Sequence, residues 1–392
     1  MAEKNIFELS ANDSNARAGI LHTSHGSVPT PVFMPVATQG SVKALDSIDL
    51  KNSGAEMILG NAYHLYLRPG PNVIKELGGL HQFMSWSGPI LTDSGGFQGF
   101  SLEHLRKITE NGITFKSHID GSIHTFTPEN AILHQQDIGA DVIMQLDVCM
   151  PTGNSEEEIL AALNMTTRWA VRCLETFSNS NQLLFGIIQG GVFNKLREKS
   201  AEALLPLDFP GYAIGGLSVG ESKTELYKTT KFTTQLLPEY KPRYLMGVGS
   251  PEDLVEAVAS GIDMFDCSLP TRIARNGALF TKTGRANLHS SQFKHLDQPV
   301  EVNCNCFTCS TFSAAYLHHL FRAKELSAYR LATIHNVSFI LRLMRDIRES
   351  IVAGRFDKFR TDFHDHFVPP DPSVRHEQRQ KWLRAQEKSR RS

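Results

Sequence analysis

The sequence predicts an α/β fold, a (β/α)8 barrel, and three observations support this prediction. Short apolar runs of β-forming residues alternate with stretches of helical periodicity along most of the chain, and this alternation is typical of a parallel sheet. Eight such runs occur, which favours a closed barrel over an open doubly wound sheet. Polar residues follow several runs at their C-terminal ends, where barrel enzymes have their active sites.

The expected strands are rich in Val, Ile, Leu, Met and Phe, as strands of a buried parallel sheet are. In chain order they span residues 30–38, 56–65, 89–98, 141–149, 183–191, 211–221, 242–249 and 263–272. A long helix is expected at 155–177, because Ser155 precedes an acidic first turn. Apolar residues at helical spacing predict another helix at 250–262.

The composition describes a globular chain with a sizeable core: 392 residues, 41% hydrophobic, with a formal net charge of −1. This neutral total indicates no particular charged partner. No stretch of about 18 or more apolar residues occurs, and the N-terminus lacks the apolar segment of a signal peptide. We therefore expect a cytoplasmic protein with no membrane partner.

The polar residues that end these strands are expected to meet at the mouth of the barrel. They are Asp93, Asp147, Gln189, Gly215, Gly216 and Asp266. One aspartate alone would carry little weight, because polar residues commonly begin where an apolar strand ends. The group of carboxylates, a glutamine and a diglycine indicates a binding or catalytic site. A Gly-rich phosphate loop with its lysine is missing, so the sequence does not predict a nucleoside triphosphate site.

A compact group of thiols predicts a metal site. The stretch NCNCFTCS, residues 303–310, contains Cys304, Cys306 and Cys309. A tetrahedral zinc site needs one more ligand, usually Cys or His. His318, His319 and His335 follow on two expected helices, and we expect His335 to be the fourth ligand. Four protein ligands leave no open position for water, so the predicted zinc is structural. A redox or free-thiol role for the cysteines is the alternative.

Long motifs stand out along the chain: NAYHLYLRPG, LTDSGGFQ, FKSHIDGS, FGIIQGG, GYAIGGLSVGE, YLMGVG, GIDMFDCSLPTR, and C-x-C-x2-C followed by IHN. By these motifs the chain resembles the tRNA-guanine transglycosylases, the enzymes of the queuosine pathway, from about Ala16 to about Phe367. The resemblance implies an irregular (β/α)8 catalytic barrel at 1–367, with a zinc subdomain at about 285–345 inserted in it. Residues 368–392 read as a basic, flexible tail.

The resemblance implies a glycosyltransferase that exchanges guanine at the wobble position of GUN-anticodon tRNAs (Asp, Asn, His, Tyr) for 7-aminomethyl-7-deazaguanine. Such an exchange needs a carboxylate nucleophile that holds the ribose covalently, and a second carboxylate for proton transfer. By similarity, Asp266 is the nucleophile and Asp93 the general acid/base. The zinc-ligand positions are those of Cys304, Cys306, Cys309 and His335.

The resemblance also implies the residues that bind the substrates. Positions that contact the base correspond to Asp147, Gln189, Gly216, Leu217, Phe97 and Met246. Arg272 and Arg275 follow the expected nucleophile and are the expected contacts to the tRNA anticodon loop. The free 7-deazaguanine base is the second substrate, and family members lead us to expect a homodimer.

One departure and three alternatives accompany this interpretation. Val148 stands where bacterial members usually have an acidic residue, whereas Cys149 and Val219 are the bacterial choices that suit the smaller base over queuine. The first alternative is the same exchange with queuine, as a salvage enzyme, and the second is a non-catalytic partner subunit of such an enzyme. The third is a zinc-stabilised barrel hydrolase that acts on small glycosides.

Overall fold

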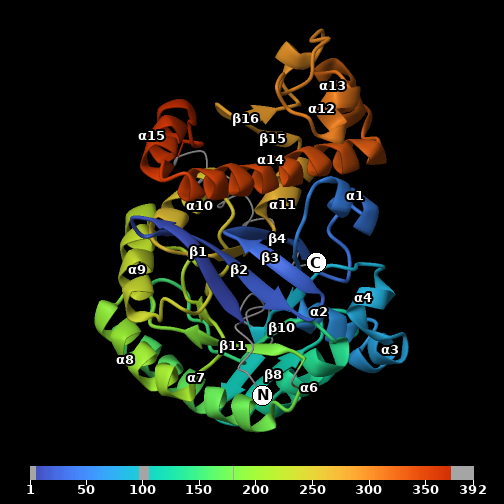
Figure 1. Cartoon of the computed structure of the whole chain (residues 1–392). Coiled ribbons are helices and arrows are strands. Elements are labelled where there is room, and N and C mark those ends of the chain that lie inside the picture. The colour runs from blue at the N-terminus through green and yellow to red at the C-terminus, as the bar shows by residue number, and fades with distance from the viewer. Residues whose placement is uncertain (1–5, 97–105, 180, 372–392) are drawn as a thin grey trace.

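The computed structural model describes residues 6–96, 106–179 and 181–371. Eight parallel strands form a closed barrel in the order β10-β11-β12-β13-β14-β4-β5-β6 (Figure 1). The barrel strands are β4 (Val32–Ala37), β5 (Ile58–Gly60), β6 (Ile90–Thr92), β10 (Val142–Met144), β11 (Leu183–Ile188), β12 (Tyr212–Ile214), β13 (Arg243–Leu245) and β14 (Met264–Cys267). The predicted barrel is therefore confirmed, and each expected strand contains one of these shorter strands.

Helices follow the strands and cover the outside of the barrel. They are α1 (Ser47–Asn52), α2 (Ala62–Leu67), α3 (Pro71–Glu76), α4 (Gly79–Phe83), α6 (Pro128–Ile138), α7 (Glu156–Thr176), α8 (Asn194–Leu204), α9 (Lys223–Leu236), α10 (Pro251–Ala259) and α11 (Leu269–Arg275). Ser155 caps α7 through a reciprocal capping box with Glu158, as the sequence predicted. None of the helices in the described parts of the chain has the length and apolar character needed to span a bilayer.

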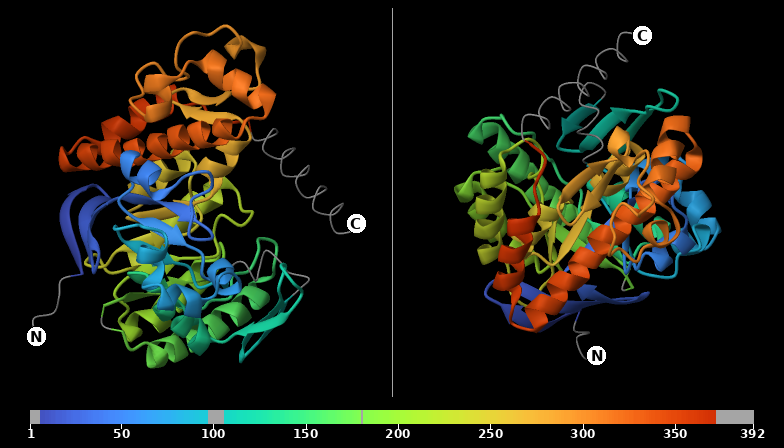
Figure 2. Two further views of the ribbon diagram at one scale, coloured as in Figure 1. Left: turned by 90° about the vertical axis from the view of Figure 1, so that its right-hand side faces the viewer. Right: turned by 90° about the horizontal axis from the view of Figure 1, so that it is seen from above.

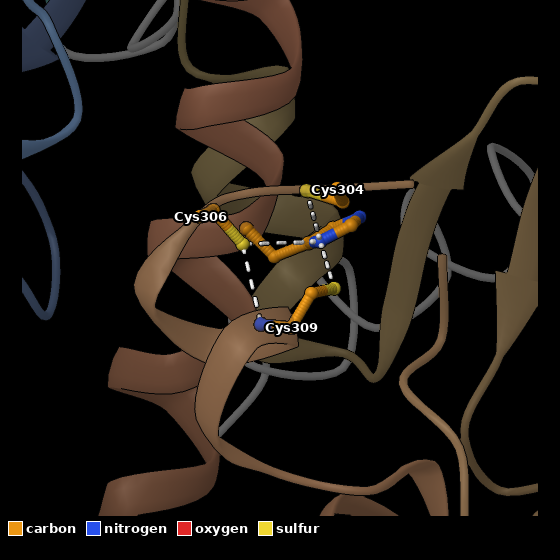
Figure 3. A group of neighbouring side chains, drawn as sticks. Cys304, Cys306 and Cys309 are labelled. Atoms are coloured by element: carbon orange, nitrogen blue, oxygen red, sulfur yellow. Dashed lines mark hydrogen bonds between the residues drawn. The ribbon is translucent and has the colours of Figure 1, made fainter. Parts of the chain in front are cut away.

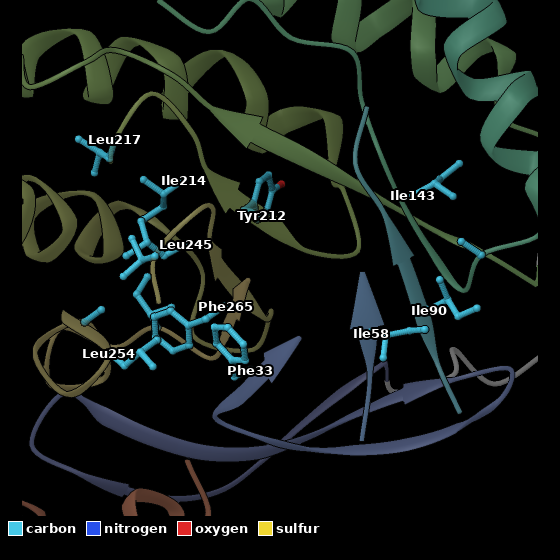
Figure 4. Packing of buried hydrophobic residues seen from close by; sticks show 14 of the residues in the cluster. Phe33, Ile58, Ile90, Ile143, Tyr212, Ile214, Leu217, Leu245, Leu254 and Phe265 are labelled. Carbon is cyan, nitrogen blue, oxygen red and sulfur yellow. The ribbon is translucent and has the colours of Figure 1, made fainter. Parts of the chain in front are cut away.

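Neighbouring residues of each strand belong to two different apolar clusters, because side chains alternate between the two faces of a sheet. Tyr244 and Met264 belong to one cluster, whereas the next residues, Leu245 and Phe265, belong to the other. The second cluster includes helix residues, and Figure 4 places Leu254 of α10 beside Leu245 and Phe265. The barrel thus has a filled interior and a separate layer beneath the helices.

Two antiparallel sheets lie at opposite ends of the barrel (Figure 2). The first consists of β1 (Phe7–Asp13), β2 (Ala16–Thr23) and β3 (Gly26–Thr30), and the second of β7 (Arg106–Thr109), β8 (Gly112–Lys116) and β9 (Ile123–Phe126). Neither sheet was expected from the sequence. Glu110 and Asn111 form the turn between β7 and β8, and Gly112 begins β8. The Asn-Gly dipeptide at 111–112 is a turn signal that would have indicated this hairpin.

The chain after α11 adds a second layer above the barrel (Figure 1). It contains β15 (Ala278–Thr281), β16 (Gly284–Asn287), α12 (Phe307–Thr311), α13 (Ala314–Ala323), α14 (Leu326–Val352) and α15 (Phe356–His366). Residues such as Leu279, Leu317 and Ala332 form a small apolar core of their own there. The 27 residues of α14 then return across the barrel. Most of the expected basic tail, 372–392, lies outside the described residues.

Candidate active site and metal cluster

Asp93 lies directly after β6, at the C-terminal end of the barrel, and both of its carboxylate oxygens accept hydrogen bonds. Oδ2 accepts from the side-chain amide of Asn61 at 2.5 Å, and Oδ1 accepts from the backbone N–H of Ala62 at 2.9 Å. The N–H of Gly95 also donates to Oδ1, at 3.3 Å. Since Asn61 caps α2 and Ala62 begins it, the start of this helix holds the Asp93 carboxylate.

Asp266 lies in β14, and one of its oxygens is fixed by two donors. The Tyr244 hydroxyl donates to Oδ1 at 2.6 Å, and the N–H of Gly247 donates to the same oxygen at 2.9 Å. Within the described chain, no hydrogen bond occupies Oδ2. Burial raises the pKa of Asp266, and the two hydrogen bonds oppose that rise. The site therefore presents one oriented oxygen of an anchored carboxylate.

Asp147 and Gln189 form a direct pair between the ends of neighbouring strands. The Gln189 amide donates to Oδ2 of Asp147 at 2.7 Å, and the Ser94 hydroxyl donates to Oδ1 at 3.1 Å. Burial raises the pKa of Asp147 to about 6, against the lowering effect of these two hydrogen bonds. A carboxylate with two acceptor oxygens suits the N–H edge of a purine.

Gly216 completes this pair because its backbone approaches Gln189 closely. Its φ of +67° is unfavourable for residues with a Cβ, and a Cβ there would lie 2.4 Å from Oε1 of Gln189. The neighbouring Leu217 is buried and Met246 is half-buried. Phe97, the other predicted ring contact, lies outside the described residues.

The two predicted RNA contacts lie on α11, shortly after Asp266. Arg272 is exposed, whereas Arg275 is half-buried and donates from Nε to the carbonyl of Thr271 at 3.2 Å. Only Arg272 has its side chain open to a large ligand in this conformation. The roles of both arginines stay predictions.

The three cysteines and His335 form the buried cluster that the sequence predicted, and their ligand atoms lie within 4.8 Å of one another. Nδ1 of His335 lies 3.9, 3.6 and 3.2 Å from the sulfurs of Cys304, Cys306 and Cys309 (Figure 3). Nε2 lies 2.7 Å from the carbonyl of Phe280. A proton on Nε2 leaves the Nδ1 lone pair directed at the thiols, as metal binding requires.

The chain around His335 ties this cluster to the barrel. Asn336 accepts the Phe280 N–H and donates to the carbonyls of Pro270 and Ala278, each at 3.0 Å. Pro270 lies four positions after Asp266, so Asn336, the neighbour of His335, bonds the segment that follows Asp266 in the chain. Arg342 of α14 donates to the sulfur of Cys304 at 3.3 Å.

A second group of potential metal ligands, at the other end of the barrel, is better explained as a structural anchor. Asp141 accepts from the N–H groups of His25 and Ile90, and its oxygens also contact the rings of His25 and His81 at 2.8 and 3.0 Å. The two imidazoles are stacked, with centroids 3.6 Å apart. Parallel rings direct their nitrogen lone pairs along parallel lines, which disfavours convergence on one ion.

Sequence comparison places the chain in a known family. A sequence model described as queuine tRNA-ribosyltransferase matches residues 12–368. The chain belongs to the queuine tRNA-ribosyltransferase family. A queuine tRNA-ribosyltransferase of Dehalococcoides mccartyi strain 195 is 55% identical, with 97% of each chain covered. Another, from Pelotomaculum thermopropionicum, is 55% identical over 91% of this chain and 97% of its own.

A queuine tRNA-ribosyltransferase from Dictyoglomus turgidum is 50% identical over 96% of this chain and 98% of its own. Membership of the family identifies the chain as a glycosyltransferase of the tRNA-guanine transglycosylase class. Six residues that bond the carboxylates were not singled out from the sequence: Asn61, Ala62, Ser94, Gly95, Tyr244 and Gly247. All six lie within motifs already noted there, NAYHLYLRPG, LTDSGGFQ and YLMGVG.

Proposed function

We propose that this family member exchanges guanine at the wobble position of tRNAs with GUN anticodons, those for Asp, Asn, His and Tyr, for 7-aminomethyl-7-deazaguanine. The observation that carries the proposal is the state of Asp266, whose Oδ1 is anchored by Tyr244 and Gly247. Anchoring one oxygen orients the other for attack on the anomeric carbon of a ribose. A glycosyl ester then preserves the energy of the broken bond until the second base arrives.

The steps balance as a double displacement at the anomeric carbon. Oδ2 of Asp266 forms a bond to this carbon while the bond to guanine breaks, and the departing base takes the electron pair and a proton from Asp93. The incoming base then returns a proton to Asp93 and displaces the Asp266 carboxylate. Burial raises the pKa of Tyr244 well above its usual value, so this residue stays a hydrogen-bond donor throughout.

Recognition of the base is assigned to the residues around Asp147. The ionised carboxylate of Asp147 would accept the N–H groups that guanine and its 7-deaza analogues share, and Gln189 orients it. Leu217, Gly216 and Met246 would complete the walls of the site, with Phe97 as the proposed ring contact. A target base must leave the stacked anticodon loop to reach these groups, and Arg272 and Arg275 are the proposed phosphate contacts.

We propose 7-aminomethyl-7-deazaguanine rather than queuine as the incoming base because of the residues that follow Asp147. Val148, the residue that departs from the usual bacterial choice, is buried among the apolar residues of the main core. We therefore expect its change to leave the shape of the base site intact. Cys149 and Val219 supply the features expected with 7-aminomethyl-7-deazaguanine. The names of the relatives mention queuine, and exchange with queuine is the second candidate function.

The proposed cofactor is one structural zinc ion per chain, held by Cys304, Cys306, Cys309 and His335. Three thiolates and one imidazole are a common tetrahedral zinc set with no open position. When bound, the ion would link the segment 304–309 to α14 and take no part in the chemistry. The proposed location of the enzyme is the cytoplasm, where its tRNA substrate occurs.

The proposed homodimer would use an exposed apolar face near this cluster. Exposed side chains on α1, α12, α13 and α14 contribute to it: Ile48, Phe307, Tyr316 and Leu326. Arg330 joins these helices, because it forms a two-bonded ion pair with Asp49 and lies over the ring of Phe307. A contiguous apolar surface that pairs with a second copy of itself is typical of twofold dimers.

Asp266→Asn tests the proposed chemistry. The amide is a poor nucleophile, so base exchange should fall by at least about a thousandfold while tRNA binding persists. The wild-type protein is also incubated with a tRNA that carries labelled guanine at the wobble position. Either 7-aminomethyl-7-deazaguanine or queuine is then added, and the release of labelled guanine is measured. Release by queuine alone would replace the proposed substrate, and base exchange retained in Asp266→Asn would refute the nucleophile. Release by neither base in the wild-type chain would favour a non-catalytic partner subunit.

A further inference from the structure

The motif FKSHIDGS, residues 115–122, has no role in the chemistry described so far, although it lies at the catalytic end of the barrel. It forms the end of β8 and the turn that leads to β9. The turn is closed by backbone bonds between Ser117 and Ser122 at 2.7 Å and between Gly121 and Ser117 at 3.0 Å. The sheet that contains this turn follows the Asp93 loop in the sequence. These bonds fix the shape of the turn.

Two histidines connect this sheet to α2. Nδ1 of His118 lies 3.0 Å from the hydroxyl of Tyr63, and the two rings are stacked. Nδ1 of His124 lies 3.0 Å from the hydroxyl of Tyr66, while its Nε2 lies 2.6 Å from the hydroxyl of Ser122. Both tyrosines are on the same helix, three positions apart, so they project toward the same side.

The helix that receives these contacts is also the helix that holds Asp93. Ala62, the neighbour of Tyr63, donates its N–H to Oδ1 of Asp93, and Asn61 at the cap donates to Oδ2. Phe126 of β9 packs over Gly95, where a Cβ would lie only 2.7 Å from the ring. The second sheet therefore touches the Asp93 loop from one side and its supporting helix from another.

We propose that the turn at 115–122 is a brace, in which His118 and Tyr63 position the Asp93 carboxylate for proton transfer through the start of α2. Both are positioning residues, because neither contacts the reacting atoms. The proposal rests on the proposed role of Asp93. A shift of about 1 Å in a reacting group costs up to about a hundredfold in rate. Loss of the hydrogen bond between Tyr63 and His118 should therefore lower the rate of guanine release about tenfold.

The test uses two short RNA hairpins that carry the target nucleotide as guanosine or as 7-methylguanosine. The methylated base is already cationic and leaves without an added proton, so its release does not need Asp93. His118→Ala and Tyr63→Phe should each slow guanine release about tenfold, leave KM for RNA within about twofold, and leave 7-methylguanine release unchanged. The double variant should be no slower than either single one, because the two residues share one contact.

His134→Ala is the matched control. Its ring packs against Tyr66 and Phe126 in the same cluster, and no hydrogen bond involves it within the described chain. This variant should release guanine at the wild-type rate. Tyr63→Phe removes one oxygen only, and so tests the brace even where His118→Ala fails to fold.

Equal slowing of both leaving groups, or of neither, in His118→Ala and Tyr63→Phe would overturn the brace. Asp93→Asn, measured in parallel, separates this failure from that of the proposed function. If Asp93→Asn slows guanine release alone and the two brace variants do not, the role of Asp93 stands and the brace is wrong. Equal slowing of both bases by Asp93→Asn would remove the proton-transfer role on which the brace depends.

Discussion

At the scale of single residues, the three carboxylates of the mouth differ by their donors. Asp266 has one oxygen anchored and one available, Asp93 has both oxygens bonded to the start of α2, and Asp147 is bonded to two neutral side chains. These arrangements suit attack, proton transfer and recognition of N–H groups, respectively. Aspartates alike in the sequence are thus distinguished by neighbours that the fold supplies.

The pKa of Asp147 predicts how base binding depends on pH. Burial raises this pKa to about 6, and only the ionised carboxylate can accept an N–H group with each of its two oxygens. The KM for free guanine should therefore fall as pH rises from about 5 to about 7. Base exchange measured at several pH values checks this, with Asp147→Asn as the variant whose KM should be higher and independent of pH in this range. A KM for the wild type that is flat across the range would contradict the assignment.

The raised pKa of Asp147 also affects the stability of the fold. The folded chain keeps the Asp147 proton at pH values where the unfolded chain has lost it, so this group destabilises the fold increasingly as pH rises from about 4 to about 6. Asp147→Asn should therefore be more stable than the wild type at pH 8, by about 1 to 2 kcal/mol, and not at pH 4. Denaturant unfolding at the two pH values measures the difference.

At the scale of elements, the sequence predicted the parts that follow a periodic rule. The barrel strands, α7 and α10 were predicted because apolar runs and capping residues are local signals. The strands are shorter than expected, since residues such as Asp93 and Gln189 leave the ladder to form the mouth. The antiparallel sheets were missed because their strands, Phe7–Asp13 for example, mix exposed and buried positions without a long apolar run.

The site was predictable only in part, for a related reason. Cysteine spacing and strand ends identified the cluster and the carboxylates, because both patterns are contained within short segments. The partners of these groups come from distant segments: Tyr244 bonds Asp266, and Ser94 bonds Asp147. A sequence without a fold contains no signal for such pairs.

The metal cluster predicts the behaviour of the element that contains it. Cys306→Ser replaces a thiolate by a poor zinc ligand, so the purified variant should lose its zinc and unfold locally around 304–309. Elemental analysis gives the metal content, and limited proteolysis gives the local unfolding. Cys267→Ser, which changes a thiol outside the cluster, should retain one zinc per chain. Full zinc content in Cys306→Ser would count against the proposed ligand set.

At the scale of the whole molecule, the two ends of the barrel carry different groups of side chains. The proposed catalytic carboxylates lie at the C-terminal ends of the strands, whereas Asp141 with His25 and His81 anchors the other end. The cluster of Cys304, Cys306, Cys309 and His335 belongs to the chain from β15 to α15, which forms a further layer above the barrel (Figure 1). The exposed apolar face defined by Ile48, Phe307, Tyr316 and Leu326 belongs to neither end.

This apolar face predicts the oligomeric state. Introducing charge with Phe307→Asp and Leu326→Asp together should convert a dimer to a monomer, because each interface of a twofold dimer contains both changes twice. Light scattering on the purified variant measures the mass. Val352→Asp is the control, since Val352 is also exposed and apolar but ends the same helix at its far side. A monomeric wild type, or a dimeric double variant, would contradict the proposed face.

Helix α14 connects the cluster of three cysteines and His335 to the first antiparallel sheet, and a chelator should affect only the part of the helix at the cluster. In its first half His335 faces the thiols, and near its end Arg348 donates to the backbone carbonyls of Gly19 and Thr30 in the first antiparallel sheet. Removing the proposed zinc ion should therefore divide the helix into two zones of amide hydrogen exchange. The first zone should exchange faster once its anchor is lost, whereas the second should keep its protection because Arg348 is unaffected. The boundary between the zones would mark how far the stabilisation by a single bound ion extends along one continuous helix.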